Sequence, residues 1–63
     1  MTKHEIIKHL RSIPKAYAGI MPQSTYSGTL KSIEEGTAKQ STEEAFFKRF
    51  GFVKVRDVEY EKE

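Results

Sequence analysis

The sequence predicts a mainly α-helical fold in which four short helices are followed by one C-terminal β-strand. Apolar residues recur at helical spacing, proline and glycine interrupt them at intervals, and the pattern changes to alternation after Gly51. No repeat, low-complexity tract or linker divides the 63 residues. A chain of this length supports one small domain, so we treat residues 1–63 as a single domain.

The first helix is predicted to begin after Thr2 and to end near Arg11 or Ser12. Thr2 and Glu5 have the spacing of a capping box, in which each side chain bonds the other residue's backbone amide. An apolar stripe follows at Ile6, Ile7, Leu10 and Ile13. Pro14 disfavours helical geometry in the residue before it and lacks an N–H group, so it should end the helix.

The second helix is predicted from Pro14 to Met21, because proline suits the first turn of a helix. Its candidates for burial are Ala16, Tyr17, Ile20 and Met21. The third helix is predicted from Tyr26 to about Glu35, with an N-cap from one of the polar residues Gln23, Ser24 and Thr25. Gly36 should end it in the left-handed conformation.

The fourth helix is predicted after a second capping box, formed by Ser41 and Glu44, and it should end before Gly51. Its apolar residues are Ala45, Phe46, Phe47 and Phe50. The remaining segment alternates between apolar and charged residues, which predicts one amphipathic strand. Because a lone strand is unstable, it must pair with an extended segment of this chain or with the same strand of a second copy.

The composition favours a cytoplasmic protein and gives no support to an enzyme. The chain has no cysteine, no apolar run of the roughly 20 residues that span a membrane, and a charged N-terminal segment unlike a signal peptide. His4 and His9 do not share one helix face tightly, and the paired glutamates are adjacent rather than facing. We expect no catalytic residue, no metal and no cofactor.

The charge is unevenly distributed along the chain. The net charge is +2, but residues 1–31 hold five bases against one acid and residues 32–63 hold six bases against eight acids. The basic half contains the third helix, whose outer surface is rich in hydroxyl groups. This coincidence suggests an anionic partner, although a solvated basic face is the commoner cause of so modest an excess.

The third helix has the features that a helix in the major groove of duplex DNA requires. Such a helix needs short polar side chains near its amino end, donors for phosphates, and an apolar face that packs on its domain. Tyr26, Leu30 and Ile33 supply that apolar face. The polar side chains are those of Gln23, Ser24, Thr25, Ser27, Thr29, Lys31 and Ser32. Composition alone leaves open an ordinary solvent-exposed helix.

The segment TLKSIEEG resembles the end of the recognition helix in the phage repressor and Cro-like helix-turn-helix family. The matching residues are Leu30, Ile33, Glu34 and Gly36. The next segment, TAKQSTEEAFFKRFGF, is similar to the family's following unit of a polar loop, a serine N-cap, an apolar helix and a hydrophobe-Gly-hydrophobe end. The resemblance covers about Ser24 to Phe52 and implies a helix-turn-helix core.

The resemblance implies a sequence-specific transcriptional regulator of phage or mobile-element type that binds double-stranded operator DNA as a homodimer. The implied base contacts are Gln23, Ser24, Thr25, Ser27 and Thr29, and the implied phosphate contacts are Lys15, Lys31 and Lys39. Some small Cro-like regulators dimerise through a C-terminal strand. By analogy the candidate dimerisation strand is residues 52–61, with contacts from Val53, Val55, Val58 and Tyr60.

A second interpretation is a small protein-interaction module or inhibitor built on a helix-turn-helix-like scaffold that does not read DNA. The low net charge and the acidic second half favour it. The two interpretations differ in the surface potential expected around residues 23–31, which should be continuously positive for a DNA-binding protein.

Overall fold

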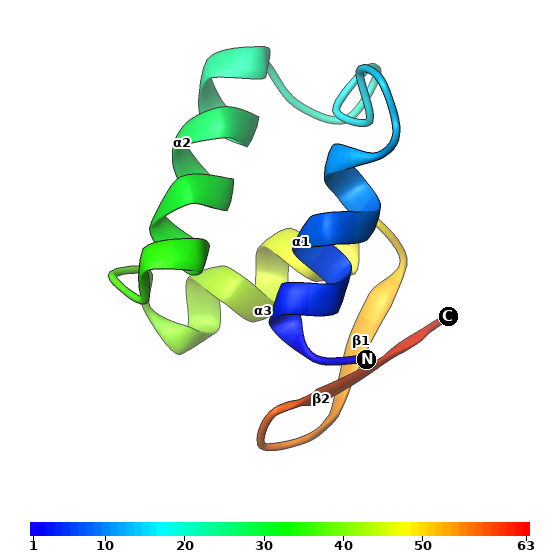
Figure 1. Cartoon of the computed structure of the whole chain (residues 1–63), viewed down its shortest axis with the longest axis vertical. Helices are drawn as coiled ribbons and strands as arrows, with labels where there is room; N and C mark the ends of the chain where they lie inside the picture. The colour runs from blue at the N-terminus through cyan, green and yellow to red at the C-terminus, as the bar shows by residue number, and fades with distance from the viewer.

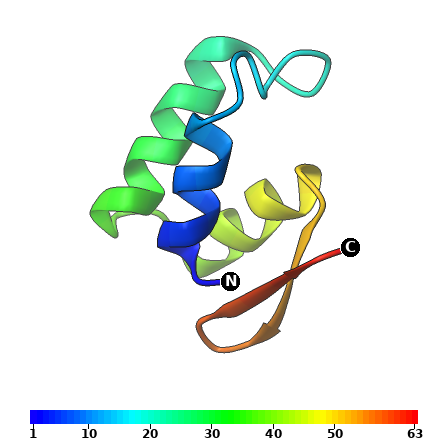
Figure 2. The same ribbon diagram turned by 45° about the vertical axis from the view of Figure 1, so that its right-hand side comes forward.

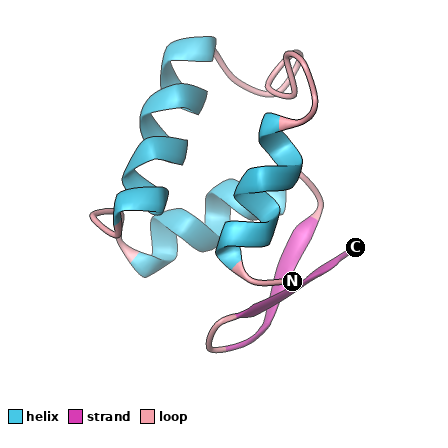
Figure 3. Ribbon diagram, viewed as in Figure 1, coloured by secondary structure: helices cyan, strands magenta, loops and turns pink.

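The computed structural model describes residues 1–63 as three α-helices followed by a two-stranded antiparallel β-sheet (Figure 1). The elements are α1 (Lys3–Arg11), α2 (Gln23–Glu35), α3 (Gln40–Arg49), β1 (Phe52–Arg56) and β2 (Glu59–Lys62). Helices α1 and α2 lie side by side, and α3 runs across their lower ends in Figures 1 and 2. The hairpin of β1 and β2 lies beside α3 and the N-terminus (Figure 3). The mainly helical fold is confirmed, but the number of helices is three rather than four.

Helix α1 has the limits that its sequence predicts. The Thr2 hydroxyl accepts a hydrogen bond from the Glu5 amide at 3.4 Å, and a Glu5 carboxylate oxygen accepts one from the Thr2 amide at 2.8 Å. The helix ends at Arg11, as expected ahead of Pro14. Local chemistry is sufficient to define both ends of this helix.

The predicted second helix, from Pro14 to Met21, is wrong. Residues 12–21 form consecutive turns, in which the Ala18 amide donates to the Lys15 carbonyl and the Ile20 amide to the Tyr17 carbonyl, both at 2.9 Å. Lys15 has φ +53° and Gly19 has φ +79°, and neither value is compatible with a right-handed helix. Glycine adopts the left-handed conformation without steric cost, so Gly19 allows this segment to close as turns.

Helices α2 and α3 begin at residues other than the predicted caps. The N-cap of α2 is Pro22 and that of α3 is Lys39, and neither makes a side-chain capping bond. The predicted capping box of Ser41 and Glu44 is therefore wrong, because α3 already begins at Gln40.

The short connection between these helices explains the early start of α3. Gly36 ends α2 with φ +80°, as predicted, and the Thr37 amide donates to the Ser32 carbonyl at 2.9 Å. This closure of the last turn leaves only Gly36–Lys39 between α2 and α3. The chain enters α3 before it reaches Ser41.

The predicted single C-terminal strand is a hairpin. Strands β1 and β2 pair within the chain, with Phe52 opposite Lys62 and Val53 opposite Glu61. The other edge of β2 is held by Met1, whose carbonyl accepts from the Tyr60 amide at 2.7 Å and whose ammonium group donates to the Tyr60 carbonyl. Of the two pairing partners that the sequence left open, the structure shows the one within the chain.

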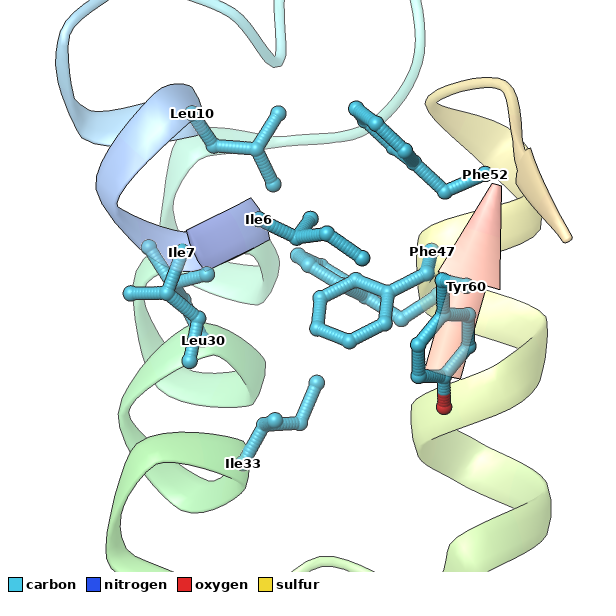
Figure 4. Packing of buried hydrophobic residues seen from close by; sticks show 9 residues of the cluster. Ile6, Ile7, Leu10, Leu30, Ile33, Phe47, Phe52 and Tyr60 are labelled. Atoms are coloured by element: carbon cyan, nitrogen blue, oxygen red, sulfur yellow. The ribbon is translucent and has the colours of Figure 1, made fainter. Parts of the chain in front are cut away.

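The core is a single cluster contributed by all five elements (Figure 4). Its buried side chains are Ile6, Ile7, Leu10, Leu30, Ile33, Phe46, Phe47, Phe52 and Tyr60. The rings of Phe47 and Tyr60 meet edge to face with their centroids 5.0 Å apart. The Tyr60 hydroxyl donates to a Glu43 carboxylate oxygen at 2.6 Å, so the hairpin is fastened to α3. None of the three helices has both the length and the apolar character required to cross a membrane.

Two glycines should respond oppositely to replacement by alanine. A β-carbon at Gly28 would have no protein atom within 4 Å, so Gly28→Ala should stabilise the domain by about 1 kcal/mol through helix propensity. Gly36→Ala should destabilise it by about 1 kcal/mol, because φ is +80° there. In thermal unfolding followed by circular dichroism, the melting temperature should rise by about 4–8 °C in Gly28→Ala and fall by about the same amount in Gly36→Ala. A lower melting temperature for Gly28→Ala would contradict the exposed position of this residue.

Candidate nucleic-acid interface

The five predicted base-contacting residues all lie in the first half of α2, but they do not share one face. Gln23, Ser24, Thr25 and Ser27 are exposed, and Thr29 is half-buried. Ser27 faces a groove between α1 and α2, whereas Thr25 and Thr29 face a groove between α2 and α3. A helix rotates by about 100° per residue, so residues 23–29 cover its whole circumference. The predicted set is therefore divided between two sides of the helix.

The α1–α2 groove encloses about 530 Å³ and has an apolar floor with charged walls. Its charged and polar lining consists of Arg11, Lys15, Ser27, Lys31 and Glu34. Arg11 donates two hydrogen bonds to the Glu34 carboxylate, at 2.6 and 2.8 Å, and these bonds lower the pKa of Glu34 and raise that of Arg11. Neither lysine has a carboxylate partner. The groove thus has an excess of two positive charges.

The α2–α3 groove is smaller, about 380 Å³, and is rich in hydroxyl groups. Its polar lining consists of Thr25, Thr29, Ser41, Thr42 and Arg49, over a floor that includes Phe46 and Met21. Arg49 lies in the last turn of α3 and makes no ion pair. This groove brings two of the predicted base contacts together with residues of α3.

On α3 one of the two acids has a cationic partner, and the bases at its two ends have no carboxylate partner. Glu43 accepts the hydrogen bond from Tyr60, and Glu44 pairs with Lys54 at 3.1 Å. The bases without a carboxylate partner are Lys39, Lys48 and Arg49. Ser41, Glu44, Ala45 and Lys48 are exposed, and their spacing of three, one and three residues places them on one ridge of α3, where the Glu44 carboxylate is paired with Lys54.

The helix pair predicted for the helix-turn-helix core is not formed, because residues 14–21 are not helical. The two helices joined by a short turn are α2 and α3, connected by four residues that include Gly36. In a helix-turn-helix the second helix is the one that enters the major groove. By this criterion the second helix of the pair is α3 rather than α2.

The predicted phosphate contacts are also divided. Lys15 and Lys31 line the α1–α2 groove, whereas Lys39 is the N-cap of α3. Four exposed residues of α3 were not predicted as site residues, namely Ser41, Thr42, Lys48 and Arg49. The signal that could have found them is the short connection containing Gly36, since it identifies α2 and α3 as the helices joined by a tight turn.

The predicted dimerisation residues have different environments. Tyr60 is 1% exposed and belongs to the core, so its ring is not available to a second copy. Val53 is half-buried and Val55 is 45% exposed. Val58 lies in the hairpin turn and is 75% exposed. The strand therefore offers valine side chains, but not Tyr60, to the solvent.

Comparison with protein-family models, with curated proteins and with solved structures found no match for this chain. Its class is therefore defined by its own architecture, which is a three-helix domain with a C-terminal hairpin and a short turn between α2 and α3.

Proposed function

We propose that the protein is a sequence-specific DNA-binding regulator of phage or mobile-element type, and that α3 is the helix that enters the major groove. The observation that carries this proposal is the surface of α3. Lys48 and Arg49 of α3 and its N-cap Lys39 have no carboxylate partner, while Glu44 is paired with Lys54 and Glu43 accepts a hydrogen bond from Tyr60. The four-residue turn that joins it to α2 supports the same assignment.

The chemistry of the α3 ridge suits direct readout of bases. Serine and threonine hydroxyls donate to and accept from base edges, arginine and lysine bind guanine, and the alanine methyl group packs on thymine. Ser41 and Thr42 provide hydroxyl groups, Ala45 provides a methyl group, and Arg49 provides a guanidinium group. Thr25 and Thr29 of α2 extend the polar surface through the α2–α3 groove.

Phosphate neutralisation by Lys39, Lys48 and Arg49 should make the affinity strongly dependent on salt. Three contacts per copy correspond to a fall of about 40-fold in the association constant for a fourfold rise in salt concentration. Fluorescence anisotropy of labelled duplexes, drawn from the DNA upstream of the coding sequence, measures this slope directly.

Paired variants test which helix makes the contacts. Lys48→Ala/Arg49→Ala should weaken binding and reduce the salt slope by about two, whereas Lys8→Ala on α1 should reduce it by less than one. Ser41→Ala/Thr42→Ala should reduce discrimination between sequences more than Gln23→Ala/Thr25→Ala does. Circular dichroism verifies that each variant is folded. The assignment of α3 as the DNA-contacting helix would be refuted if the α3 variants and the α1 control lost equal affinity for DNA. It would also be refuted if the affinity did not depend on salt.

The alternative function is a protein-interaction module that does not read DNA. The observation that favours it is the α1–α2 groove, which combines unpaired lysines with an apolar floor and with Ile13, 42% exposed. Absence of binding to any duplex in the anisotropy experiment would favour this alternative.

A further inference from the structure

The α1–α2 groove is an apolar and basic surface that lies apart from the α3 ridge. Ile13 is 42% exposed beside Leu10, Tyr26 and Leu30. Lys15 and Lys31 stand at the same groove without carboxylate partners. A ligand for this groove must therefore offer apolar side chains together with negative charge.

The outer face of the hairpin has that complementary chemistry. Phe52 is buried and Lys54 points to Glu44, so Val53, which lies between them, is on the opposite side of β1. Val55 lies at the register irregularity between Lys54 and Arg56 and is 45% exposed. Glu61 is the cross-strand partner of Val53 and shares its face. Glu61 makes no ion pair, and residues 57–63 contain four acids and one base. We call the surface of Val53, Val55 and Glu61 the hairpin face.

We infer that two copies of the chain associate, with the hairpin face of each copy seated in the α1–α2 groove of the other. The valines of the hairpin face cover Ile13, and Glu61 pairs with Lys31. Each copy has one groove and one hairpin face, so two copies related by a two-fold axis form two identical contacts. No groove or hairpin face is then left for a third copy. A domain of this size also gains from an additional apolar contact.

This arrangement differs from dimerisation by strand pairing. The Tyr60 backbone of β2 is bonded to Met1 at the edge away from β1, which leaves the free edge of β1 as the alternative site for a second copy. Pairing through that edge would depend on backbone hydrogen bonds rather than on Glu61 and Lys31. A charge-exchange experiment separates the two modes.

Sedimentation equilibrium from about 5 to about 500 μM, without DNA and at low salt, tests the inference, because a small interface corresponds to a dissociation constant in the micromolar range. Lys31→Glu and Glu61→Lys should each weaken the dimer at least about tenfold, because each places like charges together. The double variant should return the dissociation constant to within about threefold of the wild type. Lys8→Glu, which makes the same charge change outside the groove, should have little effect.

Three outcomes would overturn the inference. These are a wild-type chain that stays monomeric throughout the range, a double variant as weak as the single ones, and a dimer that is indifferent to all the charge changes. The third outcome would assign the contact to the free edge of β1. Because no DNA is present, these results do not depend on the proposed regulator function, which fails or stands on the anisotropy experiment.

Discussion

Replacing Phe47 by alanine is expected to lower the free energy of unfolding by about 3–5 kcal/mol. Phe47 is fully buried between the helices and the hairpin (Figure 4). Loss of a buried phenylalanine costs about 3–5 kcal/mol, and domains of this length have a free energy of unfolding of about 3–9 kcal/mol. The variant should therefore lose much or all of its stability.

Urea unfolding followed by far-UV circular dichroism measures this effect, with Val58→Ala as the control. Val58 is 75% exposed, and its replacement should change the free energy of unfolding by less than about 0.5 kcal/mol. A Phe47→Ala variant with a cooperative transition and a loss below about 1 kcal/mol would show that Phe47 is not central to the core.

The second large effect is expected in alkaline solution. Burial of the ring, together with the hydrogen bond to Glu43, raises the pKa of Tyr60 well above its usual value of 10.0. A group whose pKa is raised in the folded state stabilises that state fully below the unfolded pKa and loses this contribution as the pH rises. The free energy of unfolding should therefore fall by about 1.4 kcal/mol per pH unit above about pH 10.

Urea titrations at several pH values between about 8 and 11.5 test this slope. Tyr60→Phe should remove most of the fall in the free energy of unfolding with rising pH. The variant also loses the hydrogen bond to Glu43, which should lower its stability near neutral pH by about 1 kcal/mol. Some slope should remain, since burial also raises the pKa of Tyr26. Identical alkaline slopes in wild type and variant would show that Tyr60 ionises as freely in the folded state as in the unfolded state.

The features that the sequence predicted correctly are those defined within a few residues. The Thr2–Glu5 capping box and Gly36 each act on the adjacent helical turn, so their chemistry is visible in the sequence. The segment from Pro14 to Met21 has helical spacing, but its outcome was decided by the positive φ angles at Lys15 and Gly19. Glycine permits such an angle, but nothing in the sequence requires it of a lysine.

The hairpin was missed because its turn lacks the usual signal. The two residues between the strands are Asp57 and Val58, and a two-residue hairpin loop more often contains glycine or asparagine. Besides its ladder with β1, strand β2 is held by the bonds of Tyr60 to Met1 and by its hydroxyl bond to Glu43. Both contacts join residues far apart in the sequence.

The candidate interface was predicted only in part for the same reason. Exposed hydroxyl groups on α2 follow from its apolar spacing and are present. Helix α3, by contrast, is neutral in the sequence, with Glu43 and Glu44 in its first half and Lys48 and Arg49 in its last turn. The partners of the two glutamates, Tyr60 and Lys54, lie on strands that the helical pattern does not reveal. Pairing of Glu44 with Lys54 balances one of these two negative charges, so the charge of the α3 surface depends on a tertiary contact.

The bond between Met1 and β2 brings the first residue of the chain onto its last strand. The backbone thus describes a nearly closed loop, so a short linker could join residues 1 and 63 with little distortion of the domain. New termini could then be opened in the turns of residues 12–21, away from the α3 ridge and the hairpin. A circular permutant of this kind would keep residue 1 beside Tyr60 and leave every helix uncut.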